Sequence, residues 1–106
     1  MSAVIAADNA ARIARFVESL ATRAPHTRAA YQRDVDALRE LAGDEALVKT
    51  TRAQVARYLA TLRGRGLSVR SLARMLSAWR AFFRYLIEIE PSMGDLPELG
   101  WMLAAD

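Results

Sequence analysis

Arginines without acidic neighbours are the side chains of this sequence whose spacing most suggests a chemical role. Six arginines fall between residues 63 and 86, and no aspartate or glutamate occurs from residue 46 to residue 87. On a helix, Arg70/Arg74 and Arg80/Arg84 are like-charged pairs four residues apart, which destabilise it. A solvated face usually mixes both signs of charge. The pattern therefore favours a surface for phosphate groups and base edges, which suit the guanidinium fork.

The tyrosines and the single histidine are the other candidates for reactive side chains. Tyr31, Tyr58 and Tyr85 stand among apolar residues, without the arginine and histidine neighbours that would assist a tyrosine nucleophile. We interpret them as core or rim residues. His26 has no second histidine and no cysteine in the sequence with which to share a metal ion, so no metal site is predicted.

Three closely spaced acids lack the neighbours expected for acid–base catalysis. Asp36 and Glu40 are four residues apart, but Arg33 and Arg39 lie beside them, so we interpret Asp34, Asp36 and Glu40 as a solvated face of mixed charge. The sequence also has no Walker glycine loop, no G-x-S-x-G elbow and no H-E-x-x-H motif. We therefore predict no catalytic residue and no cofactor.

The elements that position these side chains are four predicted helices, each with apolar residues at helical spacing. The first covers about residues 8–22, and Pro25 interrupts the chain after it. Thr27 is the expected N-cap of the second helix, which Gly43 can close in the left-handed conformation. No stretch alternates with a period of two, so the predicted fold class is all-α, a four-helix bundle with short loops.

The third and fourth helices carry clear start signals. The sequence TRAQ beginning at Thr51 has the pattern of a capping box, and the helix that it opens ends at Gly64 or Gly66. Ser68 is the expected N-cap of the fourth helix, which extends to about Ile89 before a proline stops it.

The fourth helix is expected to bury one face and expose the other, since successive residues are turned by about 100°. The predicted apolar stripe consists of Val69, Leu72, Leu76, Trp79, Phe83 and Leu86. The opposite face carries four arginines and a serine, namely Arg70, Arg74, Ser77, Arg80 and Arg84. One helix can thus supply both core residues and a basic surface.

Length and composition limit the class of protein. The chain has 106 residues, 53 % of them hydrophobic, which suits a single globular domain. It has no cysteine, and therefore no disulfide. Its first residues lack the basic region of a signal peptide, and no apolar run approaches the length of a membrane span. We expect a soluble, cytoplasmic and monomeric domain without membrane contact.

Two segments resemble a known family. The runs GLSVRSLARMLSAWRAFFRYL and HTRAAYQRDVDALREL, the latter with Thr27, Tyr31 and Leu38 at matching places, are similar to the fourth and second helices of one domain. That domain is the N-terminal core-binding domain of tyrosine recombinases, Xer-type enzymes in particular. The resemblance covers about residues 10–92. It implies a SAM-like four-helix fold that forms half of a clamp around double-stranded DNA.

The resemblance also implies which residues contact DNA. They lie at the start of the second helix and along the fourth: Thr27, Arg28, Arg70, Ser71, Arg74 and Ser77. Arg80 and Arg84 are expected as outer phosphate contacts or as ion pairs between domains.

Domain organisation follows from the same resemblance. Residues 1–92 correspond to the core-binding domain, and residues 93–106 to a linker toward a catalytic domain of which nothing is present here. Residues 88–106 hold five acids and no base, whereas the family continues into a basic linker. The implied function is DNA binding within a site-specific recombinase. Its implied role is resolution of chromosome or replicon dimers before cell division, together with partner recombinase subunits.

Two other interpretations stay open at this point. The basic strip could dock an acidic protein partner, in which case the chain is a helical protein–protein interaction module. The chain could also be a fragment of a helix-turn-helix repressor, although the fourth helix is long and no tight turn precedes it. The DNA sequence recognised, and the choice between dimer resolution, phage integration and cassette movement, are not encoded in any visible motif.

Overall fold

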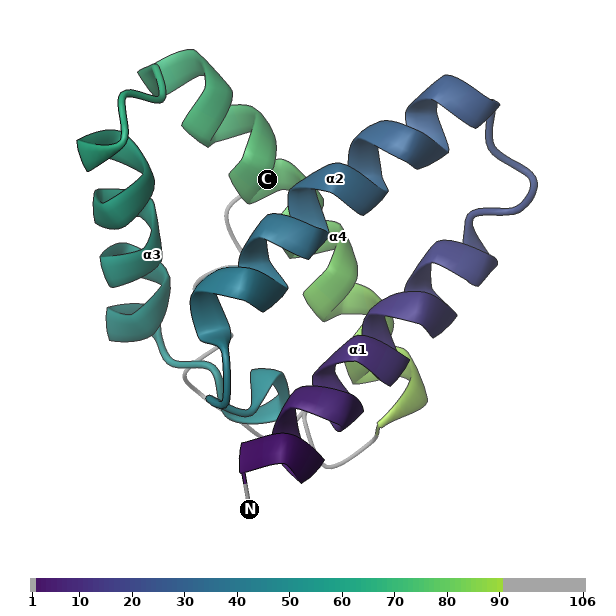
Figure 1. Ribbon diagram of the computed structural model, residues 1–106. Helices are drawn as coiled ribbons and strands as arrows, with labels where there is room; N and C mark the ends of the chain where they lie inside the picture. Colours follow the sequence, from purple (N-terminus) through teal and green to yellow (C-terminus); the bar gives the residue numbers. More distant parts are fainter. Residues whose placement is uncertain (1, 91–106) are drawn as a thin grey trace.

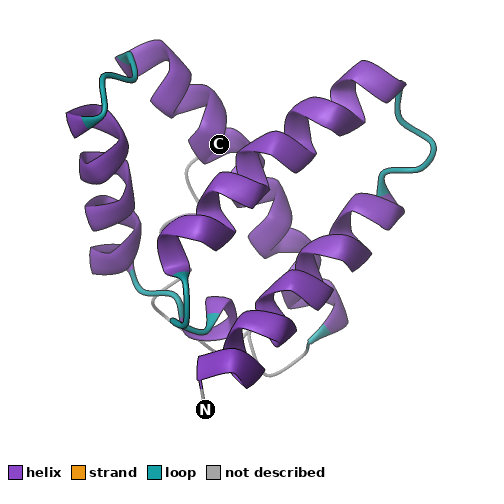
Figure 2. Cartoon of the chain, in the orientation of Figure 1, coloured by secondary structure: helices purple, strands orange, loops and turns teal. Residues whose placement is uncertain are grey.

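A computed structural model describes residues 2–90 as five helical elements (Figure 1; Figure 2). The α-helices are α1 (Ser2–Ser19), α2 (Pro25–Ala42), α3 (Arg52–Gly64) and α4 (Val69–Ile89), and a short 3-10 helix, η1 (Leu47–Lys49), precedes α3. No strand occurs within residues 2–90, which confirms the prediction of an all-α four-helix bundle. The expected acidic tail, residues 93–106, lies outside the described residues.

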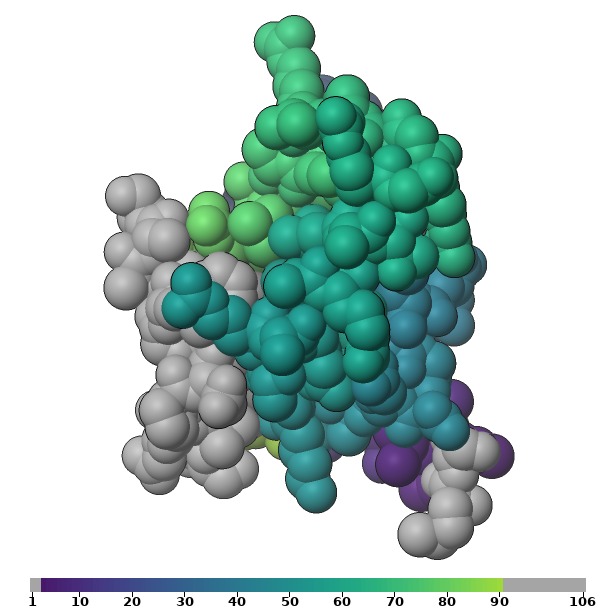
Figure 3. Space-filling view, turned by 90° about the vertical axis from the view of Figure 1, so that its left-hand side faces the viewer, coloured from purple at the N-terminus to yellow at the C-terminus, as the bar shows by residue number. Residues whose placement is uncertain are grey.

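The four α-helices are arranged around α2. α1 runs alongside α2 in the opposite direction, and α4 crosses behind α2 and packs against both α1 and α2 (Figure 1). α3 stands on the other side and packs against α4 and α2. From that side, α3 and the first turns of α4 form one continuous surface (Figure 3). In Figure 1 the N-terminal halves of α2 and α4 spread apart at the top of the molecule.

The hydrophobic core is centred on the C-terminal half of α4. Trp79, Phe82, Phe83 and Leu86 have no exposed surface. Phe16 of α1 meets the Phe82 ring edge-on, with the ring centroids 5.5 Å apart. Burying a large apolar side chain contributes roughly 1.5–3 kcal/mol. The packing of α4 therefore determines which of its faces remains available for a partner.

Two local signals of the sequence are confirmed, and a third is confirmed only in the position of the helix end. Thr51 Oγ1 accepts a hydrogen bond from the Gln54 N–H (3.2 Å) while the Gln54 side chain accepts one from the Thr51 N–H (2.9 Å), which is a complete capping box. Ser68 Oγ accepts from the Ser71 N–H at 3.1 Å and so caps α4. Gly43 ends α2 with a φ of +58°, which favours glycine, although its ψ of −110° lies outside the left-handed helical region.

Two helix boundaries differ from the prediction. α1 begins at Ser2 rather than near Asp8, and it ends at Ser19. α2 begins at Pro25, with Ala24 in the N-cap position and no side-chain cap, so the prediction of Thr27 as N-cap is wrong. A proline fits the first helical position because the missing N–H would have no helical partner there and because its φ is already helical. Pro25 therefore starts a helix rather than interrupting one.

Asn9 of α1 contacts the loop between α2 and α3. Asn9 is only 1 % exposed. Its Nδ2 donates to the Glu45 carbonyl at 2.9 Å, and its Oδ1 accepts from the Leu47 N–H at 3.0 Å. A buried amide with both ends satisfied holds two backbone groups that the helices leave unpaired. Asn9 thus connects α1 to the segment that leads into α3.

Candidate nucleic-acid interface

α4 buries a different sector from the one expected. Its buried residues are Met75, Ala78, Trp79, Phe82, Phe83 and Leu86. Leu72 and Leu76 are only partly buried, and Val69, predicted in the apolar stripe, is 67 % exposed. Val69 lies in the first turn of α4, which stands apart from α1 and α2 in Figure 1. The buried sector is turned toward Ala78 and Phe82 because α2 and α1 pack on that side.

α2 and α4 diverge toward their N-terminal ends (Figure 1). A groove lies between the two helices. It is lined by His26, Thr27, Ala30, Tyr31 and Asp34 from α2 and by Arg74, Ser77 and Ala78 from α4. We call this surface the α2–α4 groove. Three residues expected to contact DNA, Thr27, Arg74 and Ser77, therefore line one surface although they come from two helices. Bringing them together required the crossing of α2 and α4, which no local pattern encodes.

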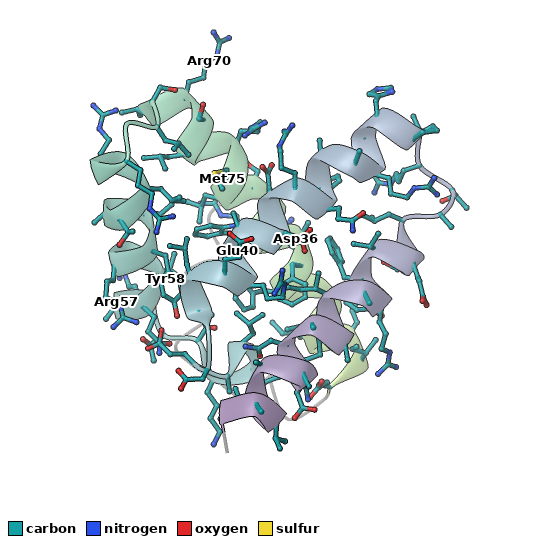
Figure 4. The ribbon with its side chains drawn as sticks, in the orientation of Figure 1. Asp36, Glu40, Arg57, Tyr58, Arg70 and Met75 are labelled. Atoms are coloured by element: carbon teal, nitrogen blue, oxygen red, sulfur yellow. The ribbon has the colours of Figure 1, made fainter. Side chains whose placement is uncertain are left out.

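The other residues expected on the fourth helix and at the start of the second do not line this groove. Arg70 is exposed, and its side chain projects away from the body of the protein (Figure 4). Ser71 is partly buried, and its N–H is bound by Ser68. Arg28 Nη1 donates to the Ala21 carbonyl at 3.4 Å, which directs this guanidinium toward the turn between α1 and α2. Arg70 is thus the most accessible of these groups.

Arg80 departs from the outward face on which the sequence pattern placed it. It is partly buried, and its Nε is buried without a hydrogen-bond partner within the described residues. Val69 and Arg80 lie on nearly the same face of α4, so their different burial follows from their position along the helix. Val69 lies in the first turn, whereas Arg80 lies beside the buried residues Trp79 and Phe82. Arg84 is exposed, as expected.

Asp34 is the residue at this site that the sequence pattern did not identify. Its interpretation as part of a solvated face is wrong, because it is only 3 % exposed. Asp34 Oδ1 lies 3.3 Å from Arg74 Nη2 and 3.6 Å from Arg33 Nε. The Asp34 carbonyl accepts a hydrogen bond from Trp79 Nε1 at 2.8 Å. Backbone and side chain of Asp34 thus both engage α4.

A sequence signal for the burial of Asp34 does exist. Tyr31, Asp34 and Leu38 follow the spacing of three and four residues that marks the inner face of a helix. The charge at position 34 masks this spacing. Asp36 and Glu40 do belong to a solvated face of mixed charge. Asp36 is partly exposed, with its Oδ1 3.9 Å from Arg39 Nε, and Glu40 is exposed (Figure 4).

A second cluster of charged groups surrounds Glu45 at the start of α3, away from the groove. Arg57 Nη2 contacts both Glu45 carboxylate oxygens at 2.6 and 2.7 Å, and the Tyr58 hydroxyl donates to Glu45 at 2.5 Å. The hydrogen bonds from Arg57 and then Tyr58 lower the pKa of Glu45. Burial, followed by the hydrogen bond to Glu45, raises the pKa of Tyr58 to about 12. The cluster attaches the α2–α3 loop to α3, as the labelled Arg57 and Tyr58 in Figure 4 illustrate.

The three tyrosines occupy structural positions. Tyr58 is 3 % exposed, and Tyr31 and Tyr85 pack against Phe16 with ring centroids 6.2 and 5.6 Å away. These contacts confirm their interpretation as core and rim residues. Within residues 2–90, no group of three or more histidine, cysteine or acidic side chains is placed to hold a metal ion. In the same range, no helix has the length and apolar character needed to cross a membrane.

Comparison with known proteins gives a consistent result. Residues 13–89 match the family described as phage integrase, N-terminal SAM-like domain. Tyrosine recombinase XerC of Chromobacterium violaceum is 45 % identical over 76 residues, covering 70 % of this chain and 25 % of that protein. Tyrosine recombinase XerC of Ralstonia pickettii is 35 % identical over 82 residues, covering 71 % and 25 %. The protein of the same name from Xylella fastidiosa is 41 % identical over 66 residues, covering 59 % and 22 %.

The chain spans about a quarter of the length of the curated relatives that it matches. No solved structure gives a significant match to it.

Proposed function

The chain belongs to the family of phage integrase N-terminal SAM-like domains, and from this premise we propose that it is the DNA-gripping module of a site-specific tyrosine recombinase. The observation that carries the proposal is the α2–α4 groove, in which Thr27, Arg74 and Ser77 come together. Hydroxyl and guanidinium groups are the side chains that most often bind phosphates and base edges. Arg70, one helical turn before Arg74 on α4, is exposed and adds a positive charge next to the groove.

The proposed division of labour separates binding from chemistry. Duplex DNA would lie against α2 and α4, and this domain would supply affinity and register. Phosphate contacts by Arg70 and its neighbours carry no sequence information, whereas a guanidinium in the groove, such as that of Arg74, can read a guanine edge. Strand cleavage through a phosphotyrosine link would belong to a catalytic domain elsewhere in the full-length protein.

The proposed biological role follows the name shared by the relatives, tyrosine recombinase XerC. We place the parent enzyme in DNA recombination in the cytoplasm, with resolution of chromosome or replicon dimers during chromosome segregation as its task. Partner recombinase subunits would assemble on the same DNA through the full-length protein.

Binding to a short random-sequence duplex, followed by fluorescence anisotropy, tests the proposal. Arg70→Ala/Arg74→Ala should weaken binding by at least about tenfold at low salt. Each phosphate contact that is lost means that fewer counterions are released from the DNA on binding, and this release favours binding. Four to six phosphate contacts predict a slope of log affinity against log salt of about −4 to −5. Equal affinity of this variant and the wild type would remove α4 from the interface, and a slope near zero would refute the charge argument.

The matched control removes the same number of charges elsewhere. Arg15 of α1 and Lys49 of η1 are both exposed and do not line the groove. Arg15→Ala/Lys49→Ala should therefore keep most of the wild-type affinity. An equal loss in both double variants would mean that net charge, and not the groove, determines binding.

A further inference from the structure

A buried carboxylate lies in a groove that is proposed to receive a polyanion. Asp34 lines the α2–α4 groove, its side chain is only 4 % exposed, and its Oδ1 lies 3.3 Å from Arg74 Nη2. Stability gives little reason for such a residue, because a buried carboxylate loses its hydration, and attraction to half-exposed Arg74 offsets that loss only in part. Its position instead suggests a role in the use of Arg74.

Two contacts hold Asp34 against α4, one to its backbone carbonyl and one to its carboxylate. Trp79, which has no exposed surface, donates its indole N–H to the Asp34 carbonyl at 2.8 Å. Trp79 and Arg74 both belong to α4, so backbone and side chain of Asp34 face the same helix. A carboxylate fixed in this way orients the guanidinium that it contacts, as a partner of an arginine fork does in general.

The rest of the Arg74 side chain remains available to a ligand. The side chain is 51 % exposed. A guanidinium has five N–H donors, so one edge can face Asp34 while the others point into the groove. Guanine presents two acceptors, O6 and N7, that match two such donors in one plane. An arginine with a fixed plane suits this geometry better than one that rotates freely.

Asp34 also changes the charge that the groove presents. Its carboxylate offsets the Arg74 charge locally and repels phosphate. Arg70 is exposed, and it forms no ion pair with a carboxylate within residues 2–90. Phosphates should therefore be held at the rim, and the less charged interior of the groove should face a base edge.

We propose that Asp34 is a positioning residue that orients Arg74 to read a guanine edge and directs phosphate contacts away from the interior of the groove. This inference rests on the proposed function and adds a residue and a specificity to it. Asp34 acts through Arg74 and need not touch the DNA. The prediction is a guanine preference at one position of the bound duplex that depends on an acidic side chain on α2.

Selection from a pool of randomised duplexes, with sequencing of the bound fraction, tests this directly in the wild type and in Asp34→Asn. The wild type should prefer guanine at one position by about 5- to 100-fold, the range of a good bidentate contact. Asp34→Asn should reduce that preference strongly. Its affinity for the unselected pool, measured by anisotropy, should stay the same or rise, because the groove loses one negative charge.

A purely structural role of Asp34 predicts a different result, namely that preference and general affinity fall together. That result, or an unchanged preference in Asp34→Asn, would overturn the proposal. A wild type that binds the pool tightly without any base preference would overturn it as well, yet would leave the proposed function standing. A wild type that binds no duplex would contradict both the proposed function and the role of Asp34.

Two further variants complete the design. Asp36→Asn removes the same charge from α2, but Asp36 pairs with Arg39 at 3.9 Å and lies outside the groove, so the guanine preference should persist. Arg74→Lys keeps the charge without the planar fork, and should lose the preference while keeping the salt slope. It tests the pair even if Asp34→Asn fails to fold. Loss of preference in Asp36→Asn, or its retention in Arg74→Lys, would contradict the proposal.

A measurement without DNA addresses the positioning itself. Rotation of the Arg74 guanidinium about its Nε–Cζ bond, followed by nitrogen NMR, should be slower in the wild type than in Asp34→Asn. Equal rotation rates in the two proteins would show that Asp34 does not orient Arg74.

Discussion

Trp79→Phe tests the connection between the two walls of the groove. Trp79 has no exposed surface, and its indole N–H donates to the Asp34 carbonyl at 2.8 Å. Phenylalanine keeps most of the apolar contact but removes this donor and leaves space where the larger ring lay. The lost hydrogen bond should cost about 1 kcal/mol. The residual cavity should add about 1–2 kcal/mol, so the free energy of unfolding should fall by roughly 2–3 kcal/mol in total.

For a domain of about 100 residues this loss corresponds to a decrease in Tm of roughly 10 to 20 °C. Far-UV circular dichroism during heating and in urea measures it without relying on the tryptophan signal. Val69→Ala on the same helix is the control, because Val69 is 67 % exposed and its removal should change stability by no more than about 0.5 kcal/mol. A Trp79→Phe protein as stable as Val69→Ala would refute the view that Trp79 joins α2 to α4.

Three further outcomes follow from contacts described above. Asn9→Ala should lower the free energy of unfolding by about 2 kcal/mol in urea titrations, because the Leu47 N–H and the Glu45 carbonyl both lose a buried partner. Tyr58 has its pKa raised from 10.0 to about 12 on folding, so its contribution to stability is complete below pH 10 and is lost as pH rises toward 12; Tyr58→Phe should flatten the alkaline fall in urea midpoint. Arg70→Gln should make the salt slope of duplex binding shallower by about 0.9, measured between about 50 and 200 mM salt, if Arg70 contacts one phosphate.

Local sequence signals predicted the fold class and several helix ends because their physics is local. Thr51 and Ser68 each accept a hydrogen bond from the backbone N–H three residues further along, and any chain with these residues at these places can form the same caps. Pro25 was predicted as a break before the second helix, but it is the first residue of that helix. The error is also local, because the fixed φ of proline is compatible both with a break and with the first turn of a helix. The contacts of Asn9 were not predicted because its partners lie in a loop far along the chain.

The site was predicted only as far as one helix can be considered alone. The rotation of α4 places Arg70, Arg74 and Ser77 on its exposed side, but it does not show how far each turn lies from the core. Val69, in the first turn, is therefore exposed, and Arg80, beside Trp79, is partly buried. The burial of Asp34 was missed because a charged residue is assigned to the exposed face when a helix is considered alone, even where its spacing matches the buried face. Its burial is explained only by α4, which brings Trp79 and Arg74 to it.

The contacts of Asn9 have a practical consequence for where a recombinant fragment should start. The family match begins at residue 13, so a protein trimmed to the start of that match would lack Asn9 altogether. Such a fragment would retain every groove residue and still lose the amide that secures the approach to α3. Expression boundaries for this domain are therefore better drawn at the first turn of α1 than at the limit of recognisable similarity.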